Sequence, residues 1–400
     1  TGHSSHFSIK ADTWNYSKWG KYIKHLPAVN GYGQAISNRF INRVILYILY
    51  FIRKTIGSTN AIFTRPPRRK EIKKLKFIFS KYDRFIGSGA TPAIFDSIGM
   101  RLDLFFPYSI GIENVNEDFF KKYRTSKNPL IRYLANQMYQ MQVKGIRNAK
   151  TIINTEFLGS TTEAFREIDV KPKNIPVPFV YPFEKVNKNK FSKNLRFALQ
   201  KINENDFVIV CHSRHQWICP KNFIKKEWKD VSKNNDWLIK SYGEFLRLRP
   251  NANSLLILFE YGEDYLQSKQ LCEKLKIESK ITWIPCMDRK EILQIIKCSS
   301  VGVGEFYDKD IMWGGTAWEI ISKGCPLIQG LRINSNEFLK ISGYPLPPLF
   351  PVNCKENITE HLLTLYDNKS LRNNIKPQSQ DWFNKYNGYV AAKDIYDLIK

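Results

Sequence analysis

Residues 301–330, VGVGEFYDKDIMWGGTAWEIISKGCPLIQG, hold the pattern that decides the fold. A short apolar run ends at about Glu305, and the polar loop after it closes with Gly314 and Gly315. Periodic apolar residues then predict a helix over 316–323, which a glycine and a proline end before a second apolar run. A strand, a helix and another strand in this order are typical of a parallel sheet.

The two glycines at the predicted start of this helix indicate a phosphate site. Glycine lets the backbone approach a ligand closely, and the free amides of Gly314, Gly315 and Thr316, with the helix dipole, favour a diphosphate. Glu319 lies one turn further on and can accept hydrogen bonds from two ribose hydroxyls. The alternative is a simple turn followed by a Glu on a solvated face.

The same alternation of strand and helix extends through the second half of the chain. Strands are predicted in DFVIVCHSR (206–214), NSLLILFEYG (253–262) and KITWIP (280–285), with a helical segment between each strand and the next. Because these runs are short, apolar and β-branched, we expect a doubly wound sheet with ligand at the carboxyl ends of its strands. Residues 83–113 show the same β-α-β rhythm in the first half.

Length and composition predict two domains, because 400 residues that are 43% hydrophobic exceed one ordinary core. Residues 171–190 carry four prolines and a polar run, which indicates a linker. We therefore expect one domain over 1–180, a second over 195–375 and a terminal segment over 376–400. The chain begins without Met, so we allow for a missing first strand in the first domain.

Positive charge is in large excess, with a net charge of +25 and a pI of about 9.6. Such a chain attracts polyanions, although a general bias toward Lys, Asn and Ile is an alternative cause. Residues 39–56 are apolar and flanked by arginines, and residues 64–84 are strongly basic. These segments either lie at an anionic membrane surface or form a buried helix beside a solvated basic face. Phe77 and Phe79 suit a nucleic-acid surface in their spacing, but burial in a strand explains them more simply.

The cysteines and the absence of export signals predict a cytoplasmic protein. Seven cysteines occur without Cys-x-x-Cys spacing, which favours reduced thiols. No apolar run reaches the length of about eighteen residues that a membrane span needs, and the first residues lack a signal-peptide pattern. We expect a cytoplasmic location, at the inner face of the plasma membrane if the basic segments bind lipid.

The decisive pattern resembles the donor-binding element of the family 4 (group 1) glycosyltransferases. In that family a Gly-containing loop precedes a helix written E-A-x-A-x-G-x-P-V-I. Glu319, Gly324, Pro326 and Ile328 match this spacing, and Gly314 falls at the family's loop glycine. The resemblance implies a GT-B fold, in which two Rossmann-like doubly wound domains face each other across a cleft. The first domain would bind the acceptor and the second the nucleotide sugar, with the last helix packing back on the first.

A second match covers DFVIVCHSRHQW and, further on, SKNNDWLIKSYGEFLRLRPN. These resemble the family's strand ending in Gly-Arg and its Lys-Gly-x-Asp-x-Leu-Ile motif. The residues in register are Arg214, Lys233, Asp236, Leu238 and Ile239. In such enzymes the Arg and Lys neutralise the leaving diphosphate. Because the gap before Lys233 is longer than in the family, the inserted lysines are alternatives to it. These are Lys221, Lys225 and Lys226.

One carboxylate of the family pattern is missing. The family places a Glu eight positions before the helix Glu, where it contacts the donor sugar, and that position here is Ile311. We expect a substitute from the longer loop. The candidates are Glu305, which ranks first because it closes the strand, and then Asp308 and Asp310.

The family's His near the reacting carbon is also missing, since the expected loop reads GSGATP (87–92). His212 and His215 flank the motif arginine and are expected to bond phosphate or sugar hydroxyls. Their spacing hints at a metal, but no third ligand stands near, so we expect none. Pro285 and Met287 follow the strand that resembles the one beside the nucleotide base, and we expect donor contacts there.

The resemblance implies sugar transfer from a nucleotide sugar, either UDP- or GDP-linked, to a glycan or lipid-linked acceptor. It further implies retention at the anomeric carbon, no metal or other cofactor, and a part in making cell-surface polysaccharide or glycolipid. Nucleic acid is not an expected partner. The alternatives are a sugar-nucleotide epimerase of the same fold, a non-catalytic relative and, less favoured, a nucleic-acid-binding protein.

Overall fold

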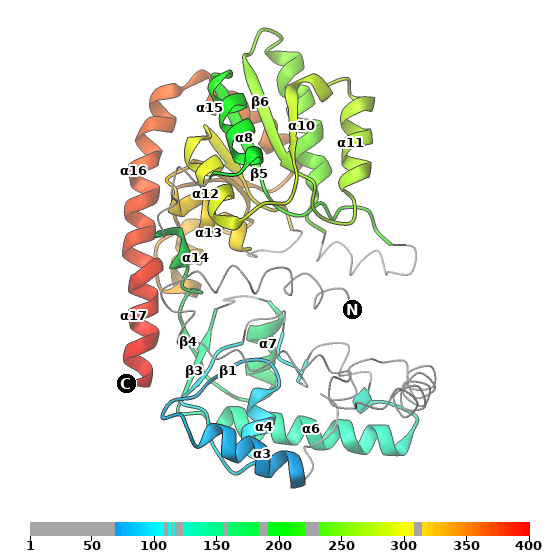
Figure 1. Ribbon diagram of the computed structural model, residues 1–400, viewed down its shortest axis with the longest axis vertical. Helices are drawn as coiled ribbons and strands as arrows, with labels where there is room; N and C mark the ends of the chain where they lie inside the picture. The colour runs from blue at the N-terminus through cyan, green and yellow to red at the C-terminus, as the bar shows by residue number, and fades with distance from the viewer. Residues whose placement is uncertain are drawn as a thin grey trace. The chain divides into compact units, whose positions relative to one another are not determined.

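The computed structural model of this chain describes residues 69–107, 111–113, 115–116, 123–155, 159–183, 191–220, 232–307 and 314–400. In these residues the strands form two parallel sheets, with helices between successive strands (Figure 1). One sheet has the order β1-β2-β3-β4 and the other the order β10-β9-β8-β5-β6-β7. The predicted α/β class is confirmed.

The six-stranded sheet is built from the apolar runs of the second half. Every residue of β5 and β6 is buried, as expected of nearly continuous apolar runs in a parallel sheet. The strands are β5 (Phe207–Cys211), β6 (Ser254–Phe259), β7 (Ile281–Ile284), β8 (Val301–Val303), β9 (Leu327–Gly330) and β10 (Leu349–Val352). The helices are α8 (Lys193–Asn203), α10 (Asn235–Leu248), α11 (Tyr265–Lys274), α12 (Arg289–Cys298), α13 (Gly315–Ser322), α14 (Ser335–Ser342) and α15 (Lys355–Asp367).

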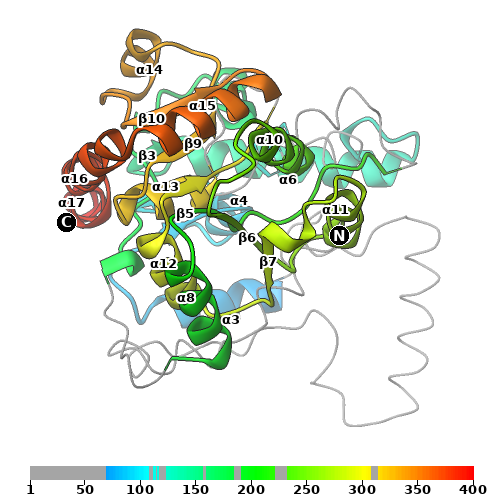
Figure 2. The ribbon, with the colours of Figure 1, turned by 90° about the horizontal axis from the view of Figure 1, so that it is seen from above.

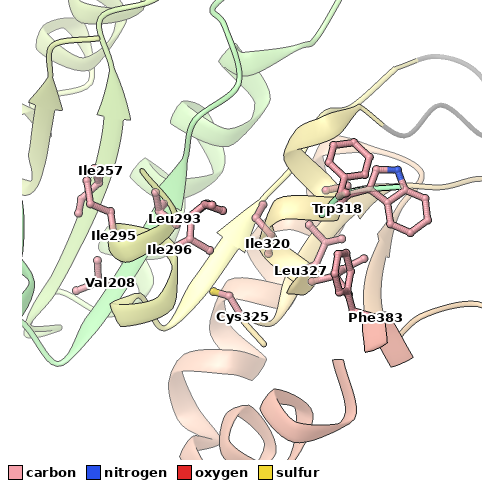
Figure 3. Packing of buried hydrophobic residues seen from close by; sticks show 14 of the residues in the cluster. Val208, Ile257, Leu293, Ile295, Ile296, Trp318, Ile320, Cys325, Leu327 and Phe383 are labelled. Carbon is pink, nitrogen blue, oxygen red and sulfur yellow. The ribbon is translucent and has the colours of Figure 1, made fainter. Parts of the chain in front are cut away.

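Helices cover both faces of this sheet, so the predicted doubly wound arrangement is confirmed. One face packs against α8, α12 and α13, where Val208, Ile296 and Ile320 share a core (Figure 3). The other face packs against α10, α11 and α15, with Ile209 and Leu238 in a second core. Figure 2 shows α8 and α12 on one side of β5 and β6 and α10 on the other.

The four-stranded sheet has much shorter strands. They are β1 (Ile86–Gly87), β2 (Leu104–Phe105), β3 (Thr151–Asn154) and β4 (Lys173–Asn174). The helices of this part are α3 (Arg69–Phe79), α4 (Thr91–Ser97), α6 (Pro129–Arg147) and α7 (Ser160–Glu167). Helices α4 and α6 lie so close that a Cβ on Gly145 would stand 2.1 Å from the carbonyl oxygen of Pro92, and only glycine permits this contact.

The segment between the sheets is tied to the end of the chain. It contains β4 and the short helix η3 (Tyr181–Phe183), so the predicted linker is not free of regular structure. The chain ends with α16 (Lys369–Tyr386) and α17 (Gly388–Ile399), which are separated by Asn387. The Asn387 side chain accepts from the amide of Phe179 and donates to the carbonyl of Val177, at 3.0 and 3.1 Å.

The end of α17 reaches the first sheet's part of the chain. The guanidinium of Arg84, two residues before β1, donates to the carbonyls of Ile399 and Lys400 at 2.7 and 2.9 Å. The terminal helices begin earlier than the predicted 376–400, at Lys369.

One interpretation of the basic segment is wrong. Phe77 and Phe79 lie on helix α3, not on a buried strand, and the Phe77 side chain is 66% exposed. Ile72 and Leu75 precede Phe79 at helical spacing and form the less exposed side of α3, which the alternation of Phe77 and Phe79 disguised.

Several predictions lie outside the described residues. They concern the 39–56 segment, the lysines at 221, 225 and 226, and positions 308, 310 and 311. Within the described ranges, no helix combines the length and apolar character needed to cross a bilayer. All seven cysteines are free thiols.

Candidate functional site

The carboxyl end of β5 delivers the first polar group of the site. After five buried apolar residues the chain turns through His212, Ser213 and Arg214. The Ser213 hydroxyl accepts from the side chain of Asn235 at 3.1 Å, and the same side chain accepts from the amide of Gln216 at 2.9 Å. The start of α10 therefore fixes the course of the loop that carries His212 and Arg214.

Glu319, on α13, is the centre of a buried polar cluster. Its side chain is 4% exposed, and its Oε2 lies 2.6 Å from Nε2 of His212. Its Oε1 accepts from the Tyr181 hydroxyl and lies 3.3 Å from Nε of Arg289. Burial raises the pKa of Glu319, but His212, Arg289 and Tyr181 together outweigh burial, so its pKa is lowered overall. The alternative of a Glu on a solvated face is wrong.

A second cluster joins Lys233 to Glu305, and both side chains are buried. Lys233 donates to Oε1 of Glu305 and, at 2.8 Å, bonds the hydroxyl of Tyr307. Burial lowers the pKa of Lys233, with the Glu305 charge opposing the shift, and burial beside Glu305 raises the pKa of Tyr307. The amide of Gln329 fixes the backbone of Glu305 through bonds of 2.9 and 3.2 Å.

Gly314 connects the two clusters. It precedes the first residue of α13, and a Cβ added to it would lie only 2.4 Å from Oε2 of Glu305. The carboxylate of Glu305 therefore lies against the amino end of α13, where the helix dipole stabilises negative charge. The glycine here allows this close approach, which a larger residue would prevent.

Four buried polar atoms of the segments after β5 and β8 and of the start of α13 have no hydrogen-bond partner among the described residues. They are Nδ1 of His212, Nε of Arg214, Oε2 of Glu305 and Oγ1 of Thr316. Thr316 and Glu319 stand three residues apart on α13 and share one side of the helix. Because buried polar groups normally find partners, this set is suited to a polar ligand at the carboxyl edge of the sheet.

His215 lies in a different environment from His212. Its Nδ1 is 2.8 Å from the Ser268 hydroxyl, and its ring lies 5.2 Å from the ring of Trp283. Its main chain bonds Tyr261 and Asp264, and burial lowers its pKa to about 4. These contacts give His215 a structural part, in which a neutral ring anchors the loop to β7 and α11.

The remaining predicted positions lie beyond these two clusters. Pro285 is exposed just after β7, and Met287 is half-buried against the core that α12 shares. Both precede Arg289, the first residue of α12, whose side chain reaches Glu319. Which part of a ligand these two residues meet stays a prediction.

Three side chains of the site were not predicted from the sequence. Tyr181 comes from the proline-rich segment, 138 residues before Glu319. Arg289 stands at the start of α12, and Tyr307 two residues after Glu305. Only for Tyr307 did the sequence offer an indication of a place in the site, since it lies in the loop expected to supply a substitute carboxylate.

A groove of about 720 Å³ lies away from these residues. It runs beside the edge strand β7 and is lined by residues such as Phe197, Lys201 and Thr282. No residue of the two clusters lines it. No set of three or more His, Cys, Asp and Glu side chains in the described ranges is arranged to hold a metal, and metal independence stays a prediction.

Sequence comparison does not assign the chain to a family. No protein-family model matches the chain. A stretch of 75 residues is 36% identical to X-ray repair cross-complementing protein 5 of Dictyostelium discoideum. That stretch spans 19% of this chain and 9% of that protein, so it carries no argument about the whole.

Solved structures share the fold. HepE from Anabaena, solved in complex with UDP, is 13% identical and has a TM-score of 0.54, over 82% of this chain and 81% of that one. A UDP-forming α,α-trehalose-phosphate synthase from Burkholderia xenovorans also scores 0.54 at 13% identity, over 85% and 77%. Sucrose-phosphate synthase from Thermosynechococcus elongatus scores 0.51 at 14% identity, over 82% and 75%. The chain has the α/β GT-B fold of these glycosyltransferases, as the resemblance implied.

Proposed function

We propose that this chain is a glycosyltransferase that takes a sugar from a nucleotide-sugar donor. The observation that carries the proposal is the set of four buried polar atoms without a hydrogen-bond partner among the described residues, which come from the segments after β5 and β8 and from the start of α13. Similar structures were solved with UDP and with UDP-glucose, both of HepE. This favours UDP over GDP as the nucleotide here.

The residues of the site supply each group that such a donor needs. The amides at the start of α13 and the Thr316 hydroxyl would hold the diphosphate. Arg214 and Lys233 would balance the negative charge that grows on the diphosphate as the bond to the sugar breaks. Glu319 would accept the ribose hydroxyls, and the free Oε2 of Glu305 would accept a sugar hydroxyl.

Lys233 suits its part because its position is determined from three sides. Its amide donates to Gln216 at 2.8 Å, its carbonyl accepts from Phe306 at 3.3 Å, and its amine is held by Glu305. A cation that is already in place costs little reorganisation during the reaction. Retention at the anomeric carbon and action without a metal follow the family resemblance and are proposed on that ground.

The test is ligand binding followed by turnover. Calorimetric titration with UDP, GDP and their glucose conjugates, with and without EDTA, should show one nucleotide class binding, unaffected by EDTA. Arg214→Ala and Glu319→Ala should each weaken binding at least about tenfold, since each removes a charge-assisted contact. Arg247→Ala, whose side chain pairs with Glu244 on the surface of α10, should bind like the unaltered protein. Absence of binding by every nucleotide would refute the proposal.

Turnover separates the enzyme from its alternatives. Release of the nucleoside diphosphate that depends on an added glycan acceptor supports a transferase. Binding without any turnover would instead favour a non-catalytic relative, and interconversion of the donor without acceptor an epimerase.

We also propose a lipid-linked acceptor at an anionic membrane, at the inner face of the plasma membrane. Helix α3 supports this, because Lys73, Lys74 and Phe77 are exposed on it and Tyr82 follows with 56% exposure. The protein should float with liposomes containing phosphatidylglycerol and not with phosphatidylcholine alone, and salt should release it. Replacing Lys73 and Lys74 by Glu should reduce flotation, and unchanged flotation would contradict this part of the proposal.

A further inference from the structure

Glu319 is less accessible to a ligand than its proposed role requires. His212 bonds its Oε2 and Tyr181 bonds its Oε1, while Arg289 lies 3.3 Å from Oε1 as an ion-pair partner. A carboxylate offers about four lone-pair positions, so two remain for the neighbouring hydroxyls of a ribose. Only 4% of the side chain is exposed, however, so a ribose cannot reach those positions while all three neighbours stay in place.

One of these three neighbours must therefore move when a ribose binds. His212 is buried with Glu319 at 2.6 Å and comes from the end of β5, which is fixed in the sheet. Arg289 carries a positive charge, and a diphosphate bound nearby would favour this residue staying in place. Tyr181 is neutral, and its three-residue helix η3 lies in the segment between the two sheets.

We propose that the Tyr181 hydroxyl occupies the place of a ribose hydroxyl on Glu319 and must be displaced by the donor nucleotide. This inference rests on the proposed function and adds an internal competitor to the same site. The tyrosine ring keeps other contacts, since it lies 5.7 Å from the ring of Phe179 and 5.3 Å from the guanidinium of Arg289. Loss of the hydroxyl alone therefore removes the competition without removing the packing.

Tyr181→Phe tests the inference when UDP and GDP are compared with their 2′,3′-dideoxy forms. Hydrogen bonds to a charged group contribute enough that the variant should bind the ribonucleotide about five- to tenfold more tightly. The dideoxy form has no hydroxyls to place on Glu319, so its Kd should not change. Tyr386→Phe is the matched control, because Tyr386 packs against Trp382 and not against Glu319.

The outcomes distinguish this inference from the function it rests on. Nucleotides that bind with the same Kd before and after Tyr181→Phe would overturn the inference and leave the proposed function standing. Weaker ribonucleotide binding by the variant would overturn it too, because Tyr181 would then be a ligand contact. An equal gain for ribose and dideoxyribose would point to general loosening and also overturn it. If neither protein binds any of the four nucleotides, the proposed function fails and this inference fails with it.

Discussion

Replacing Lys233 by Met tests the central ion pair of the site. Met keeps much of the length of the side chain but removes the charge. Lys233 is 7% and Glu305 is 3% exposed, so the carboxylate left behind stays out of water. Its Oε2 already lacks a hydrogen-bond partner among the described residues, and the Tyr307 hydroxyl and the amino end of α13 would remain beside the carboxylate.

The expected loss is large because one half of a buried pair is removed. Such changes cost about 3–5 kcal/mol, since the remaining charge is desolvated and uncompensated. We expect about 3 kcal/mol here, because the Tyr307 hydroxyl and the amino end of α13 still stabilise the charge on Glu305. The double variant Lys233→Met with Glu305→Gln removes both charges and should recover about 2 kcal/mol of that loss.

Urea unfolding, followed by the fluorescence of the nine tryptophans, measures the effect. With an m-value of about 3 kcal/mol/M, the single variant should unfold at a urea concentration about 1 M lower. Lys240→Met is the control, because its pair with Asp236 lies at the surface of α10 and should contribute less than about 1 kcal/mol. A loss below about 1 kcal/mol for Lys233→Met, or a double variant as unstable as the single one, would refute the reasoning.

Two further changes test other parts of the fold. Burial lowers the pKa of His215 from 6.5 to about 4 in the folded protein. Between these pH values the unfolded chain binds more protons than the folded one, so the free energy of unfolding should fall by up to about 3 kcal/mol as the pH drops from 6.5 to 4. In urea titrations His215→Asn should lose this component of the pH dependence, and an unchanged slope would contradict it. Gly304→Ala places a Cβ 1.8 Å from Oε1 of Gln329, which breaks the hydrogen bonds between the Gln329 side chain and the Glu305 backbone and should lower the free energy of unfolding by about 1–3 kcal/mol. Gly243→Ala is the control, because its Cβ would have 3.7 Å to the nearest atom and the variant should be as stable as the unaltered protein or slightly more so.

The six-stranded sheet could be predicted because the composition of each strand alone identifies it as a buried strand. Runs such as Phe207–Cys211 are apolar at every position, and only a doubly covered strand buries both faces. The first sheet gave a weaker signal, since β1 is only Ile86–Gly87 and its register depends on packing. Helix α3 was misread because two aromatic residues alternate in a segment whose less exposed residues follow the helical period.

The site was predictable where it follows from strand ends and helix starts. His212, Glu305 and Glu319 stand at such positions, so their approach follows from the topology of a parallel sheet. Tyr181 does not, because its contact with Glu319 depends on how a proline-rich segment packs against α13. The structural part of His215 was also missed, because its partners lie on α11 and β7 and no local pattern marks them.

Asn387 joins the two segments that connect the sheets. The chain passes between the two sheets twice, once through the segment that includes Val177 and Phe179 and once through α16 and α17. The buried Asn387 side chain bonds both passages at one point. The two passages also pack together where the ring of Phe183 meets the rings of Phe383 and Tyr389, so they form one doubled connection instead of two separate tethers.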